Sequence, residues 1–280
     1  MAASLLLALR EGLEISLVIG IVLGVLDQLK RQDLKKVVWW GILSASLVSI
    51  FIATLLNSLE AEFEGTTETL FEGVVLFLAA ALLTRMIFWM NNQAHSLKTE
   101  IETDVKKAAS ATSRWSLFLL AFLTVIREGF ELTFFLLAAR LASTPVQVFL
   151  GALLGLLISV SVGWVMFGSS RRLNLRRFFQ VTNILLLMFA AGLVVHSIHE
   201  FIILGWIPPL VNPIWDINHF LPEKSFLGQL LGAIFGYEAS PSLVEVFAYC
   251  GYFLLLYLGL RFLPHTYKKI KIPNRHTIVT

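Results

Sequence analysis

The chain contains 280 residues, of which 57% are hydrophobic and 15% are charged, and its mean hydropathy is +0.78. Soluble domains are nearer half apolar and a quarter charged, so this composition excludes an ordinary soluble protein and indicates an integral membrane protein. The formal net charge is +3. The basic residues lie mostly in one set of connections between the apolar stretches, so this charge reflects membrane topology rather than affinity for nucleic acid.

Seven stretches are long enough to cross about 30 Å of hydrocarbon as helices. They cover residues 2–27, 37–57, 70–90, 115–139, 146–168, 178–205 and 242–263. We therefore predict an all-α protein in which residues 1–280 form a single membrane domain. The first stretch lacks a basic leader and is interrupted by Arg10, Glu11 and Glu14, so we expect it to stay as the first helix rather than to be cleaved as a signal peptide.

The basic residues predict the orientation of these helices. Sixteen Lys and Arg residues fall in one set of connections and the carboxy-terminal tail, whereas the opposite connections contain only Arg140 and Lys224. Basic residues accumulate in cytoplasmic loops, so the amino terminus is predicted outside and the carboxy terminus in the cytoplasm, in a multi-pass protein of the plasma membrane. The helices at 37–57 and 146–168 carry no charged residue, and we expect them to contact membrane lipid.

The long outer connection, residues 206–241, has a composition of its own. It contains Trp206 and Trp215 and an apolar stretch, Phe226–Tyr237, that is too short to span the membrane. An interfacial or re-entrant helix is predicted there, with the tryptophans at the headgroup boundary.

One charged pentapeptide occurs twice inside the apolar stretches. It reads Arg10-Glu11-Gly12-Leu13-Glu14 in the first and Arg127-Glu128-Gly129-Phe130-Glu131 in the fourth. Each charged residue at the centre of a membrane helix costs roughly 2.5–3.5 kcal/mol. Positions i, i+3 and i+4 share one face of a helix, so the two glutamates of each copy project together. A repeated arrangement this costly indicates a functional site.

If the two copies face each other, four carboxylates and two guanidinium groups share one site with a formal sum of −2. That charge suits a hard multivalent cation bound by oxygen ligands. Arg10 and Arg127 would hold the carboxylates in place through bidentate bonds, and Gly12 and Gly129 would leave space for a neighbouring backbone or for the ion. The alternative is a pair of structural Arg–Glu bridges that bind nothing.

The spacing of the motifs predicts an internal repeat. Glu128 follows Glu11 by 117 positions, and the helices that contain them run in opposite directions through the predicted membrane. Residues 1–90 and 115–205 are therefore predicted to form a 3+3 inverted repeat, the arrangement with which many transporters build a midplane site. The helix at 242–263 stands outside the repeat.

A second group of candidate ligands lies toward the outer surface. Its members are His196, His199 and Glu200 at the end of the sixth helix, Glu68 and Glu72 at the start of the third, and Glu245 at the start of the seventh. Imidazole and carboxylate groups on one helical face can bind a transition metal, and acidic side chains raise the local cation concentration. Alternatively, the histidines form a hydrogen-bonded cap, and the acids between the second and third helices, Glu60 among them, are solvated loop residues.

The doubled Arg-Glu-Gly-x-Glu motif, in the first and fourth of seven membrane helices, resembles the iron permease family, which includes fungal oxidase-dependent iron transporters and bacterial EfeU-type permeases. The resemblance implies import of iron, with Glu11, Glu14, Glu128 and Glu131 as transport ligands. It implies a permease rather than an enzyme, iron as the transported substrate with no permanently bound cofactor, and a separate extracytoplasmic oxidase, peroxidase or iron-delivery protein as partner.

Other functions remain open at the level of sequence. They are transport of another divalent metal such as lead or manganese, a proton-coupled carrier in which the motif glutamates relay protons, an intramembrane metalloenzyme, and a membrane scaffold with structural ion pairs. The enzyme is disfavoured because the chain has six histidines and lacks the His-Glu-x-x-His pattern of zinc peptidases.

Overall fold

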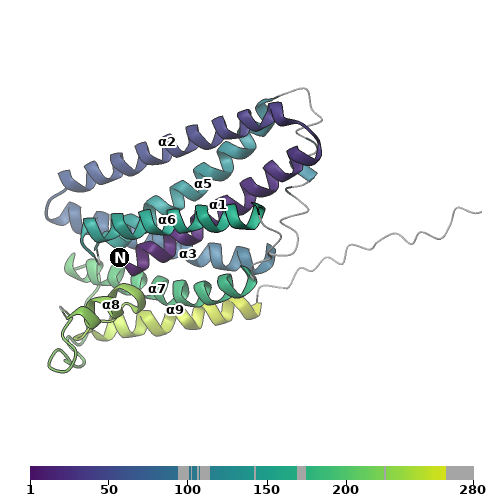
Figure 1. The fold of residues 1–280 in the computed structure, drawn as a ribbon. Helices are drawn as coiled ribbons and strands as arrows, with labels where there is room; N and C mark the ends of the chain where they lie inside the picture. The colour runs from purple at the N-terminus through teal and green to yellow at the C-terminus, as the bar shows by residue number, and fades with distance from the viewer. Residues whose placement is uncertain are drawn as a thin grey trace, which may run out of the picture.

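The computed structural model (Figure 1) describes residues 1–93, 101, 103–105, 107, 114–141, 143–168, 175–223 and 225–262. The helices with described bounds are α1 (Ala2–Gln28), α2 (Gln32–Glu62), α3 (Thr66–Gln93), α5 (Trp115–Leu141), α6 (Pro145–Gly168), α7 (Leu175–Ile203), α8 (Phe226–Phe235) and α9 (Leu243–Phe262), and residues 101, 103–105 and 107 are also helical. No strand occurs in the described part of the chain. Four helices, α2, α3, α6 and α7, are long and apolar enough to cross a membrane. The prediction of an all-α, multi-pass membrane protein is thereby confirmed.

Each of the seven predicted stretches coincides with a helix, but α2 is longer than predicted. It has 31 residues, about 46 Å at 1.5 Å per residue, because its polar ends continue the helix beyond the apolar stretch at 37–57. Glu60 therefore lies in the last turn of a helix and forms an ion pair with Arg140 at 3.1 Å. The interpretation of Glu60 as a solvated loop acid was wrong.

The long helices lie alongside one another in a bundle (Figure 1). The most extensive contacts join α1 to α6, α2 to α5 and α3 to α7, and α1 also packs on α5. Glycine permits the closest of these approaches. A Cβ at Gly155 of α6 would lie 2.5 Å from the carbonyl oxygen of Leu5 and 2.7 Å from the nitrogen of Leu9. The backbones of α1 and α6 are therefore in direct contact.

Two apolar clusters form the core, one on each side of the charged motifs along α1 and α5. The first joins α1, α3, α5 and α7 and includes Leu7, Leu83, Phe135 and Leu186. The second joins α1, α2 and α5 and includes Val22, Leu26, Val38 and Leu117. Water is therefore kept from the motif residues in both directions along these helices.

Helix α8 is capped at both ends and packed on α7. Ser225 Oγ accepts a hydrogen bond from Gly228 N at 3.0 Å, and Gly236 ends the helix in the left-handed conformation with φ 66°. A Cβ at Gly192 of α7 would lie 2.7 Å from Gly236 Cα, so two glycines make the contact. The predicted short helix is confirmed as a helix, at the same end of the bundle as the amino terminus (Figure 1). Its placement at the membrane interface stays a prediction.

The predicted orientation also stays a prediction. It rests partly on basic residues at 98, 106, 171, 172, 224 and 268–275, which lie outside the described residues.

Candidate functional site

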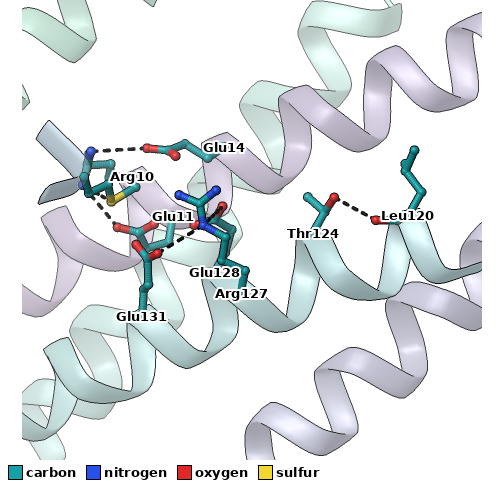
Figure 2. Close-up of polar contacts among 9 residues, drawn as sticks. Arg10, Glu11, Glu14, Leu120, Thr124, Arg127, Glu128 and Glu131 are labelled. Carbon is teal, nitrogen blue, oxygen red and sulfur yellow. Dashed lines mark hydrogen bonds and ion pairs between the residues drawn. The ribbon is translucent and has the colours of Figure 1, made fainter. Parts of the chain in front are cut away.

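Three glutamates of the two motifs meet where α1 packs on α5. One carboxylate oxygen from each of Glu11, Glu128 and Glu131 lies within 4.8 Å of the other two. Their side chains are 0%, 7% and 5% exposed, so the group is closed to solvent. Figure 2 shows these carboxylates converging from the two helices. Two segments 117 positions apart in the sequence thus share one buried cluster.

Both arginines bind the glutamate one turn further along their own helix. Arg10 Nη2 lies 3.5 Å from Glu14 Oε1 and Arg127 Nε donates to Glu131 Oε1 at 3.2 Å. Arg10 Nη1 also lies 3.4 Å from Glu11 Oε1 and 2.8 Å from Met86 Sδ. The two arginine side chains differ in burial, however: Arg10 is 0% exposed and Arg127 is 35% exposed. The two copies of one motif therefore have different surroundings.

The buried carboxylates retain coordinating capacity. Oε2 of Glu11, Oε2 of Glu128 and Oε2 of Glu131 are buried and have no hydrogen-bond partner among the described residues. A buried acceptor without a partner is costly, and a cation would satisfy all three. Oxygen ligands at about 2.0–2.6 Å from one hard ion lie at most about 4–5 Å apart, which is the separation found here. The donor set suits a hard cation.

Glu14 stands apart from these three. It interacts electrostatically with Glu128 and Glu131, but Figure 2 shows its carboxylate turned toward Arg10, away from the group of three. The sequence placed four carboxylates in one site. The structure brings three together and leaves the fourth in an ion pair with Arg10 at 3.5 Å, although Glu14 Oε1 is also buried without a hydrogen-bond partner in the described structure.

The motif glycines make room for serine side chains of neighbouring helices. A Cβ at Gly12 would lie 2.8 Å from Ser159 Cβ of α6, and a Cβ at Gly129 would lie 2.7 Å from Ser49 Cβ of α2. The space was expected to hold a backbone or the ion. A serine occupies it in both copies because α6 and α2 pack directly beside the motifs.

Gly12→Ala is therefore expected to destabilise the protein by about 1–3 kcal/mol, the usual cost of overpacking. Gly24→Ala on the same helix is the matched control, because nothing lies within 4 Å of a Cβ there. Ser159→Gly should restore the stability of Gly12→Ala. Thermal unfolding of the detergent-purified variants measures this, and equal melting temperatures for Gly12→Ala and Gly24→Ala would contradict the contact.

The predicted outer residues on α3, α7 and α9 form a series of neighbouring interactions. His199 Nδ1 lies 2.7 Å from Glu245 Oε1, and His196 is close enough to both residues to interact electrostatically. Glu200 packs beside Gly73 of α3 and interacts electrostatically with His199 and with Glu72, which also interacts with Glu68. His199 and Glu245 belong to a group whose ligand atoms lie within 4.8 Å of one another, and an outer entry site that includes the other predicted residues stays a prediction.

Sequence reasoning missed Glu238. This residue lies between α8 and α9, and its Oε1 is 3.8 Å from His199 Nδ1. Burial, and then the neighbouring Glu245 carboxylate, raise the pKa of Glu238 to about 7. It lies outside any helix and 39 positions from His199, so no periodicity or motif pointed to it.

Comparison with known proteins identifies relatives over nearly the whole chain. The model of the iron permease FTR1 family matches residues 1–270. The ferrous iron permease EfeU of Escherichia coli O157:H7 is 35% identical over 243 residues, covering 86% of this chain and 88% of that protein. The ferrous iron permease EfeU of Yersinia pestis is 33% identical over 261 residues, covering 92% of each. No solved structure matches.

Proposed function

The chain belongs to the iron permease FTR1 family, and from this membership we propose that it imports iron across the cell membrane with the motif carboxylates as ligands of the transported ion. The observation that carries the proposal is the buried group of Glu11, Glu128 and Glu131, each with a carboxylate oxygen that lacks a hydrogen-bond partner in the described structure. Ferrous iron is the proposed form, because the relatives are named ferrous iron permeases.

We further propose that seven helices span the membrane. Helices α1 and α5 have 27 residues each, which corresponds to about 40 Å of helix. They differ from ordinary membrane-spanning helices mainly in the charged residues of the two motifs. Helix α9 has 20 residues, enough for about 30 Å of hydrocarbon. Together with α2, α3, α6 and α7 they make the predicted seven.

The helix contacts support an inverted repeat of α1–α3 with α5–α7. Exchanging α1 with α5, α2 with α6 and α3 with α7 turns the α1–α6 contact into the α5–α2 contact, and it leaves the α3–α7 and α1–α5 contacts unchanged. The same exchange relates the Gly12–Ser159 contact to the Gly129–Ser49 contact. A site between two such halves can open to either side of the membrane as one half moves against the other.

In this mechanism the ion is held at the interface of the repeats. Acidic residues near one end of the bundle, Glu68, Glu72 and Glu200, attract cations toward the site. Glu11, Glu128 and Glu131 then replace the water of hydration with carboxylate oxygens, and Arg10 and Arg127 limit repulsion among the acids. Because the three glutamates are buried, the structure would represent an occluded state, in which the site is open to neither side of the membrane.

Iron uptake into proteoliposomes tests the proposal. Radiolabelled iron is supplied as Fe²⁺ with a reductant or as chelated Fe³⁺, with protein-free liposomes as the control. Uptake of Fe²⁺ above the control, without an added oxidase or peroxidase, is the expected result. Uptake of Mn²⁺ or Pb²⁺ with no uptake of iron would contradict it, as would proton flux without metal movement. Uptake confined to Fe³⁺ would favour a separate oxidase as an obligatory partner.

A further inference from the structure

A second cluster of metal-ligating side chains lies away from the motif glutamates. It joins three elements: His199 near the end of α7, Glu238 in the connection after α8, and Glu245 in the first turn of α9. One ligand atom from each lies within 4.8 Å of the other two. His199 Nδ1 is 2.7 Å from Glu245 Oε1 and 3.8 Å from Glu238 Oε1. Two ligand atoms that each lie about 2.0–2.2 Å from one transition metal are up to about 4 Å apart. Small movements of these side chains would therefore bring all three ligand atoms within reach of one ion.

One member of the cluster is held rigidly. Glu245 is 3% exposed, its Oε2 accepts a hydrogen bond from Ser242 N at 2.6 Å, and its own N–H donates to Ser242 Oγ at 3.4 Å. This is the reciprocal cap of a helix start, Ser-x-x-Glu. The cap occupies one carboxylate oxygen and directs the other at His199. Supporting hydrogen bonds of this kind orient metal ligands.

A second observation shows that the cluster has unused capacity. Glu238 Oε2 is buried and has no hydrogen-bond partner in the described structure. Glu238 and Glu245 are also two carboxylates close enough to repel each other, and a cation between them would remove that repulsion. His199 is 42% exposed, which leaves the cluster reachable from solvent.

We propose that His199, Glu238 and Glu245 form a binding site for a divalent transition metal such as Fe²⁺, separate from the motif glutamates. One imidazole nitrogen with two carboxylate oxygens selects ions of borderline softness over Ca²⁺ and Mg²⁺, which prefer oxygen alone. The ion takes the place of the proton between His199 Nδ1 and Glu245 Oε1, and that proton is released on binding. Such a site would load metal at the end of the bundle that contains α8. Its existence does not depend on transport through the motifs.

Pulsed EPR of Mn²⁺ bound to the purified full-length protein tests this site, because coupling to ¹⁴N reports an imidazole ligand. The motif glutamates supply only oxygen, so a nitrogen signal distinguishes the two places. We expect ¹⁴N coupling in the wild type and in Glu11→Gln/Glu128→Gln. We expect its loss in His199→Ala, and at least a tenfold weaker Mn²⁺ affinity of the nitrogen-coupled species in Glu238→Gln.

The control is His219→Ala, which removes a histidine outside the cluster and should retain the signal. Circular dichroism and size-exclusion elution verify that each variant is folded, and His199→Gln replaces His199→Ala if the latter is not. Absence of ¹⁴N coupling in the wild type, its persistence without His199, or unchanged affinity in Glu238→Gln would overturn the proposal. Loss of iron uptake in Glu11→Gln/Glu128→Gln with the nitrogen signal intact would separate this site from the transport function.

Discussion

Replacing Glu11 or Glu128 by glutamine is expected to reduce iron uptake to the level of empty liposomes, a loss of more than about 100-fold. Loss of a residue that merely supports a metal ligand costs about 10–100-fold, and these two residues would contact the ion directly. Glutamine keeps the size of the side chain but removes a negative charge and one strong oxygen ligand. The two substitutions lie on different helices, so an equal loss in both would indicate one shared site.

The measurement is the initial rate of radiolabelled Fe²⁺ uptake into proteoliposomes that contain equal amounts of each variant. Glu62→Gln, at an exposed position at the end of α2, is the matched control and should transport at the wild-type rate. Wild-type uptake by both Glu11→Gln and Glu128→Gln would refute the mechanism. It would leave the motifs as structural ion pairs, and exchange of Arg10 with Glu14 would then also be tolerated.

Removal of Arg10 is expected to have the largest effect on stability. Arg10 is 0% exposed and lies 3.4 Å from Glu11 and 3.5 Å from Glu14, so Arg10→Met would leave two buried carboxylates without their guanidinium partner. Breaking one member of a buried ion pair costs about 3–5 kcal/mol. Arg127→Met should cost less, because Arg127 itself is 35% exposed and an ion pair with a partly exposed member contributes less than a fully buried one.

A double substitution separates lost charge pairing from lost packing. Adding Glu14→Gln to Arg10→Met removes one of the two stranded charges and should recover part of the lost stability, a coupling that a mutant cycle measures directly. Thermal unfolding in detergent, followed by loss of monodisperse elution, gives the comparison. Equal effects of Arg10→Met and Arg127→Met would show that the difference in burial has no energetic consequence.

The element pattern was predictable from sequence because membrane helices satisfy their own backbone hydrogen bonds and differ from connections in hydropathy. The errors lie at helix ends. Polar residues such as Gln32 and Glu60 continue α2 beyond the hydrocarbon length, where hydropathy gives no signal. The shared face of Glu128 and Glu131 followed from the helical period alone, since it is a property of one helix.

The sequence by itself determined that this is a helical membrane protein, that two charged motifs lie inside its helices, and that the chain resembles iron permeases. Only the tertiary structure decided that Glu11 joins Glu128 and Glu131 while Glu14 stays with Arg10, that Ser159 and Ser49 fill the space beside the motif glycines, and that Glu238 approaches His199. Each of these contacts joins different parts of the chain or depends on how α1 packs against α5. Local periodicity cannot specify them, because burial and separation depend on which helices pack together and at which residues.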